Sequence, residues 1–68
     1  MDKITIVGMG LIGSSLGMAL KKAQVGAEIV GTDRDRQVAS RARNIGASDS
    51  TETNPLTAIR GAKLVILA

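Results

Sequence analysis

Apolar residues in this chain form short continuous runs that alternate with stretches of helical spacing. Continuous runs lie at residues 3–7, 27–32 and 63–68. Such runs are typical of strands that are covered on both faces, as in a parallel sheet. Between the first two runs, apolar residues recur every three or four positions and predict a helix over 11–22. Gly13 and Gly17 share one face of this helix, so close packing against the sheet is expected there.

A second helix is marked by its two ends. Asp35 predicts its N-cap, and the helix is expected to run to about Asn44. Gly46 suits the left-handed position that follows a helix. The inward face is expected to hold the residues at i, i+4 and i+7, namely Val38, Ala42 and Ile45.

The remaining stretch repeats the alternation more weakly. Residues 47–51 are expected to hold a short strand, and Asn54-Pro55 predicts a cap and the start of a short helix over 56–60. Strands that alternate with helices predict right-handed crossovers and a parallel sheet. The expected fold class is therefore α/β, a Rossmann-type parallel sheet with strand order 3-2-1-4 and helices on both faces.

The last apolar run, 63–68, is expected at the edge of this sheet. A flat apolar edge strand promotes aggregation unless another segment pairs with it or covers it. We therefore expect residues 1–68 to form the amino-terminal portion, the first half, of a larger domain in a longer chain.

A glycine-rich turn joins the first strand to the first helix, with the sequence Gly8-Met9-Gly10-Leu11-Ile12-Gly13. Glycine-rich six-mers also occur by chance, but this position gives each glycine a role. Gly8 permits a tight turn, Gly10 lets a pyrophosphate approach the backbone, and Gly13 lets the helix lie close to the strand. The N–H groups near Leu11 and Ile12 are expected to face the phosphates, at the positive end of the helix. Residues 1–68 are therefore expected to be the amino-terminal portion of a dinucleotide-binding domain.

Asp33 ends the second strand, twenty residues after Gly13 (33 − 13 = 20). A carboxylate there can accept the hydroxyls of an adenosine ribose and would repel a 2′-phosphate, which favours NAD over NADP. The structural alternative is an aspartate that caps the following turn. Arg34 could lie on the adenine or hold the extra phosphate of NADP, so NADP stays open. Arg34 and Arg36 could instead pair with Asp33 and Asp35.

Ser14 and Ser15 follow the glycines, and either could hydrogen-bond a phosphate oxygen. The alternative, which we favour, is that they are small residues chosen for close packing. Met9 is expected to be an apolar core or loop residue.

The composition removes several other kinds of site. The chain has no histidine, no cysteine and no aromatic residue, so no catalytic residues and no metal site are expected. The aromatic side chains on which the bases of single-stranded nucleic acid stack are therefore also missing. The net charge of +3 is read as a solvated surface, and no nucleic acid or membrane partner is expected. A cytoplasmic location is the default expectation.

These residues resemble the prephenate/arogenate dehydrogenase family along the whole chain. The most specific part is the form of the fingerprint, Gly8-Met9-Gly10-Leu11-Ile12-Gly13-Ser14-Ser15-Leu16. The stretches 30–35, 45–47 and 61–68 resemble the family as well. The resemblance carries over a cofactor-binding set of seven residues: Gly8, Gly10, Leu11, Ile12, Gly13, Asp33 and Arg34.

The resemblance implies oxidation of prephenate or arogenate by NAD(P), coupled to decarboxylation, in tyrosine biosynthesis. It also implies a second, helical domain that dimerises and supplies the catalytic residues, so the 68 residues alone are expected to be inactive. Two alternatives remain open. One is the cofactor domain of another 6-phosphogluconate-dehydrogenase-like oxidoreductase, and the other is a non-catalytic module that senses NAD.

Overall fold

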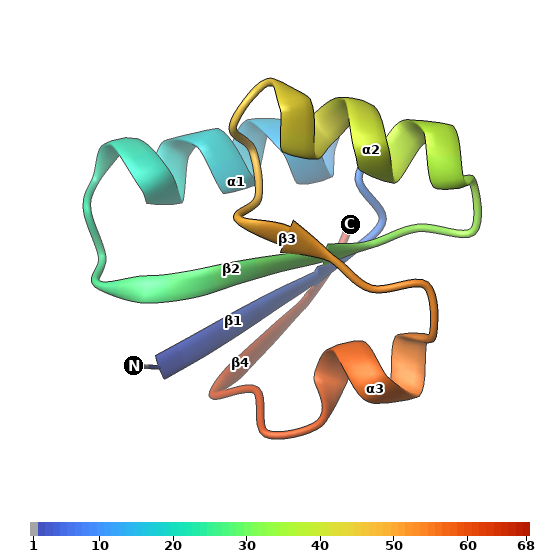
Figure 1. Cartoon of the computed structure of the whole chain (residues 1–68). Coiled ribbons are helices and arrows are strands. Elements are labelled where there is room, and N and C mark those ends of the chain that lie inside the picture. The colour runs from blue at the N-terminus through green and yellow to red at the C-terminus, as the bar shows by residue number, and fades with distance from the viewer. Residues whose placement is uncertain (1) are drawn as a thin grey trace.

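Strands and helices alternate along the whole described part of the chain. The computed structural model describes residues 2–68 and contains four strands, β1 (Asp2–Val7), β2 (Ala27–Thr32), β3 (Ser50–Thr51) and β4 (Leu64–Leu67). The helices within this range are α1 (Leu11–Lys22), α2 (Arg36–Asn44) and α3 (Pro55–Ile59). All strand pairs are parallel, in the order β3-β2-β1-β4. Helices α1 and α2 lie on one face of the sheet and α3 lies on the other (Figure 1), so the predicted fold is confirmed.

Strand β1 occupies the centre of the sheet. Its register places Ile4 beside Ile29 of β2 and Leu64 of β4. The core beneath α1 and α2 is built from apolar residues of the strands, of the turn after β1 and of α2 and its following loop: Ile4, Ile6, Met9, Ile29, Ala42 and Ala47. At the other end of the register Val7 lies beside Thr32 and Leu67. The carboxyl ends of β1, β2 and β4 therefore meet at one edge of the sheet, which is where ligands bind in folds of this kind.

Two helices begin at the caps that the sequence predicts. An Asp35 carboxylate oxygen accepts a hydrogen bond from the Gln37 N–H at 2.9 Å, and the Asn54 side chain accepts from the Leu56 N–H at 2.9 Å. These bonds satisfy donors that the first turn of a helix leaves without a partner. At the end of α2, Gly46 has φ +85°, the left-handed conformation expected after a helix.

The predicted inward face of α2 is only partly right. Ala39 and Ala42 are the buried residues of this helix, Val38 is half-buried, and Ile45 is 55% exposed. Ile45 is the C-cap residue, with φ −88° and ψ 3°, so its side chain no longer follows the spacing of the helix. The helix instead packs through two alanines, which allow it to lie close to the sheet.

The packing of α1 also differs in part from the expectation for its two glycines. A Cβ atom at Gly13 would lie 1.8 Å from the carbonyl oxygen of Gly8 and 3.3 Å from the Ile6 Cγ2 atom of β1, so the helix does pack against β1 there. A Cβ atom at Gly17 would lie 2.0 Å from the carbonyl oxygen of Ala47. Gly17 therefore packs against the loop that leads to β3, and not against a strand.

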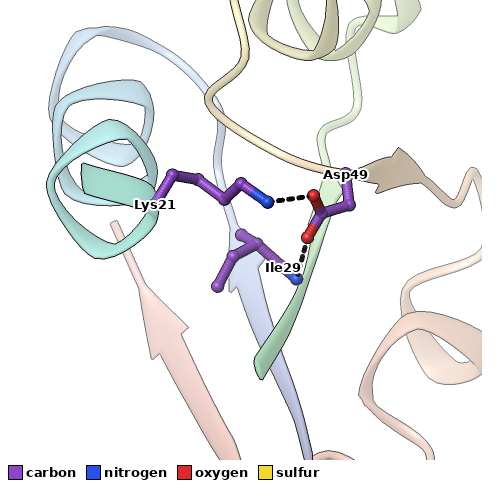
Figure 2. A network of polar contacts seen from close by, with 3 residues as sticks. All are labelled: Lys21, Ile29 and Asp49. Atoms are coloured by element: carbon purple, nitrogen blue, oxygen red, sulfur yellow. Dashed lines mark hydrogen bonds and ion pairs between the residues drawn. The ribbon is translucent and has the colours of Figure 1, made fainter. Parts of the chain in front are cut away.

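Strand β3 is shorter than the predicted 47–51, because the residues before it make other contacts. The Asp49 N–H donates to the Ile29 carbonyl at 2.8 Å, and the Asp49 carboxylate accepts from the Ile29 N–H at 2.7 Å. The second carboxylate oxygen pairs with the Lys21 ammonium at the end of α1 (Figure 2). The Ile29 N–H and then the Lys21 ammonium hold the pKa of Asp49 below its ordinary value.

Candidate functional site

The glycine-rich turn follows β1 and is held by the strands on both sides of β1. The Gly8 N–H donates to the Thr32 carbonyl at the end of β2, at 2.8 Å. Gly8 has φ +99°, and a Cβ atom there would lie 2.7 Å from the Ala68 carbonyl oxygen that follows β4. Both the backbone conformation and the lack of space therefore require glycine at this position.

The second and third glycines of the turn have different surroundings. At Gly13 the Gly8 carbonyl occupies the space that a side chain would need. Gly10 is open, because a Cβ atom there would meet no atom within 4 Å. The turn therefore packs tightly against the protein at Gly8 and Gly13 and leaves free space in front of the Gly10 backbone.

The start of α1 differs from the starts of α2 and α3. Its N-cap is Gly10, which offers no side-chain acceptor, whereas Asp35 and Asn54 cap the other two helices. As in those helices, no acidic residue lies in its first turn. The N–H groups at the start of a helix need partners from outside the helix and carry its positive end. In residues 2–68, α1 is thus the helix without a side-chain cap, a geometry that suits an anion.

One cleft of about 400 Å³ brings the turn and the end of β2 together. Its lining consists of Gly8, Gly10, Leu11, Ile12, Gly13, Asp33 and Ala68. Six of the seven residues predicted for cofactor binding therefore border the same space. Leu11 is 86% exposed and Ile12 is 67% exposed, so their side chains lie at the surface while their backbone starts the helix.

Arg34 is the predicted residue that lies outside this cleft. It borders a smaller neighbouring cleft of about 170 Å³, together with Asp33 and Pro55. Another cleft, of about 250 Å³, is lined by Asp33, Arg36 and Glu52 among others. Asp33 is common to all three, so the end of β2 lies at the junction of these spaces.

Asp33 is half-buried and uses both carboxylate oxygens. One accepts from the Met9 N–H at 2.7 Å, and the other accepts from the Asp35 N–H at 2.9 Å. The second bond is the turn cap considered as the structural alternative. A carboxylate has about four acceptor positions, so these two bonds leave acceptor capacity for a hydroxyl group.

The sequence interpretation missed the role of Met9. Its side chain is buried, as expected for an apolar residue, but its backbone carries two contacts that order the turn. The N–H donates to Asp33, and the carbonyl accepts from the Ser14 hydroxyl at 2.8 Å. The Ser14 hydroxyl thus orders the turn by a hydrogen bond, which differs from the close packing favoured above, and Ser15 is exposed and not closely packed. No sequence pattern marks such backbone contacts.

The charged residues around the cleft are largely unpaired. Within residues 2–68 the recorded ion pair is Lys21–Asp49, so Arg34 and Arg36 do not pair with Asp33 and Asp35 as the alternative interpretation would have it. The same part of the chain holds no group of three or more acidic, histidine or cysteine side chains that could bind a metal ion. None of its helices has the length and apolar character needed to cross a membrane.

Comparison with known proteins identifies relatives of this chain. No family model matches the chain. It is 41% identical over 68 residues to a prephenate dehydrogenase of Lactococcus lactis subsp. cremoris (strain MG1363), covering 100% of this chain and 19% of the relative. It is 34% identical over 67 residues to a prephenate dehydrogenase of Bacillus subtilis (strain 168), covering 98% of this chain and 18% of the relative.

A solved structure gives the same result in three dimensions. Prephenate dehydrogenase from A. aeolicus, in complex with hydroxyphenyl propionate and NAD+, superimposes with a TM-score of 0.87 at 26% identity, covering 98% of this chain and 24% of that chain. The resemblance to the prephenate dehydrogenase family is therefore confirmed along the chain. The chain spans about a fifth of the length of the curated relatives that it matches.

Proposed function

We propose that this chain is the NAD-binding segment of an enzyme of the prephenate dehydrogenase family. The observation that carries the proposal is the shared cleft, in which the uncapped start of α1, the open Gly10 and Asp33 lie at the carboxyl ends of β1 and β2. Ligands of open parallel sheets bind at this edge. The structural neighbour that superimposes on this chain is a complex with NAD+.

The residues of the cleft divide the work of holding the cofactor. The open backbone at Gly10 and the N–H groups of the first turn of α1, at Leu11 and Ile12, would hold the pyrophosphate. Gly8 and Gly13 keep the turn close enough to β1 for this approach. Asp33 accepts from the adenosine ribose, and its negative charge disfavours the 2′-phosphate of NADP.

Arg34, in the neighbouring cleft, contacts the adenine side of the cofactor. NAD supplies a hydride acceptor when it is bound. The residues of this segment bind and orient it, and we place the residues that act on the substrate outside this segment. We propose that they belong to a helical domain of a longer, homodimeric chain that oxidises and decarboxylates prephenate or arogenate. The cytoplasmic location stays a prediction.

A chimera tests this function directly. In the Lactococcus lactis relative, the matched segment is replaced by these 68 residues, and NADH formation is followed with prephenate and with arogenate. We expect activity with at least one of these substrates and a higher kcat/KM with NAD than with NADP. The 68-residue chain assayed alone is the matched control, and we expect it to give no turnover.

Two outcomes would contradict the proposal. A chimera that folds, by circular dichroism and a cooperative thermal transition, but binds no NAD would rule out the cofactor role. Turnover by the 68 residues alone would show that the residues that act on the substrate lie within this segment.

A further inference from the structure

The end of β2 holds two successive N–H groups of the glycine-rich turn. The Gly8 N–H donates to the Thr32 carbonyl at 2.8 Å, and the next N–H, at Met9, donates to the Asp33 carboxylate at 2.7 Å. The acceptor of the first bond is the backbone of β2. The acceptor of the second is the side chain of Asp33, which directly follows β2 and fixes one more residue of the turn.

The Met9 side chain is anchored on the same strand. It is 1% exposed, and a Cβ atom at Gly31 of β2 would lie 3.0 Å from the Met9 Cγ and Sδ atoms. Its carbonyl accepts from Ser14 on the first turn of α1. Met9 therefore links β2 to the start of α1 through its side chain, its N–H and its carbonyl.

We infer that Asp33 is a positioning residue for the phosphate-binding turn, acting through the Met9 N–H, in addition to its contact with the ribose. Gly10, whose open backbone faces the cleft, directly follows Met9. A buried N–H that loses its acceptor carries a free-energy cost, and the turn can relieve that cost by moving Met9. Gly10 and the first N–H groups of α1 would then leave the geometry that fits a pyrophosphate.

This inference rests on the proposed function and changes what a substitution at Asp33 is expected to do. If Asp33 touched only the ribose, removal of its charge would leave the phosphate site intact and would favour NADP. With Asp33 also holding the turn, a residue without an acceptor weakens NAD and NADP together. A change of preference toward NADP therefore requires an acceptor for the Met9 N–H to be kept.

The test separates the two roles of Asp33 by changing the ligand. The Asp33 variants are made in the chimera with the Lactococcus lactis relative, which is titrated calorimetrically with NAD and with an NAD analogue whose adenosine ribose lacks both hydroxyls. The analogue cannot make the ribose contact, so any effect of Asp33 on its affinity acts through the turn. We expect Asp33→Ala to lower the affinity for the analogue about tenfold, because one buried N–H is left unpaired.

Two variants serve as matched controls. Asp33→Asn keeps one oxygen for the buried Met9 N–H and gives up the bond to the exposed Asp35 N–H, so it should restore analogue binding to within about threefold of the unmodified chimera. Asp35→Ala removes the same charge from the same loop without touching Met9, and should leave the analogue within about twofold. Amide hydrogen exchange at Met9 should become faster in Asp33→Ala and stay slow in Asp35→Ala.

The outcomes distinguish the inference from the function on which it rests. A chimera without these substitutions that folds but binds neither NAD nor NADP would overturn the proposed function. An unmodified chimera that binds NAD, with Asp33→Ala binding the analogue as tightly as the unmodified chimera, would overturn the inference alone. The same holds if Asp33→Ala lowers the thermal stability but leaves analogue affinity unchanged at a temperature where both proteins are folded.

Discussion

Neighbouring residues of the glycine-rich turn meet very different surroundings. Gly13 has no room for a side chain, while Gly10, three residues earlier, faces open space with an ordinary φ of −71°. A side chain at Gly10 would therefore be tolerated by the fold and would occupy the space where a pyrophosphate approaches. Gly10 thus allows binding to be disturbed without disturbing the structure.

The first prediction concerns Gly10→Val in the 68-residue chain. We expect NAD affinity to fall at least about tenfold, equivalent to 1.4 kcal/mol of lost contact. The free energy of unfolding should fall by no more than about 1 kcal/mol, because glycine is only a moderately good N-cap. Calorimetric titration and urea unfolding measure the two effects.

The matched control for this variant is Ser15→Val, which adds apolar bulk at an exposed position on α1 away from the cleft lining. It should leave NAD affinity unchanged. Equal NAD affinity in Gly10→Val and in the unmodified chain would show that the cofactor does not approach Gly10.

At the scale of elements, one carboxylate connects helix α1 to the neighbouring strands β2 and β3. Lys21 at the end of α1 and the Ile29 N–H of β2 meet at Asp49, just before β3 (Figure 2). These bonds stabilise Asp49 in its charged form, which is why its pKa lies below the ordinary value. The cluster ties β2 to the carboxyl end of α1, whereas the cleft lies at the amino end of the same helix.

The second prediction is a pH-dependent loss of stability in Asp49→Asn. A lowered pKa in the folded state means that the charge of Asp49 stabilises the fold fully above the unfolded value of about 3.9, and that this gain disappears as the pH falls through the folded pKa. We therefore expect the variant to be about 1 kcal/mol less stable at pH 7, a modest value because Lys21 and Asp49 are both partly exposed. The difference should shrink steadily below pH 4.

Urea unfolding at pH 7, 5 and 3 measures this difference, with Asp2→Asn as the control that removes an exposed carboxylate elsewhere. The control should differ little from the unmodified chain at each pH. A deficit in Asp49→Asn that stays constant from pH 7 to pH 3 would show that the charge of Asp49 does not contribute.

On the scale of the whole molecule, the two edges of the sheet differ in length and in apolar exposure. The β3 edge is only two residues long, whereas β4 is four residues long and carries Leu64, Val65 and Leu67 with exposures of 50%, 40% and 81%. An apolar edge strand with free N–H and carbonyl groups pairs readily with another strand. We therefore expect β4 to govern the association state of the 68-residue chain.

The third prediction is that this chain self-associates at micromolar concentration and that Leu67→Lys shifts it toward the monomer. A charge on an edge strand opposes pairing with a second edge. Sedimentation velocity measures the shift, and the free energy of unfolding should change by no more than about 0.5 kcal/mol, as is usual for surface substitutions. Leu56→Lys is the matched control, since Leu56 is 68% exposed but lies on α3.

The control should leave the association state unchanged. A sharp monomer peak for the unmodified chain, or an equal effect of both lysine substitutions, would contradict a role for the β4 edge.

The sequence by itself determined the order and type of the elements, the caps at Asp35 and Asn54, and the positions of the glycines and of Asp33. These features depend on backbone preferences and apolar spacing over a few residues, and the strand order follows from general rules for parallel sheets. Only the tertiary structure decided which groups meet across long separations. It placed the Asp33 carboxylate on the Met9 N–H and exposed Ile45. The physical reason is that such contacts depend on how β2, the turn and the helices pack in three dimensions, and no local pattern in the chain records that packing.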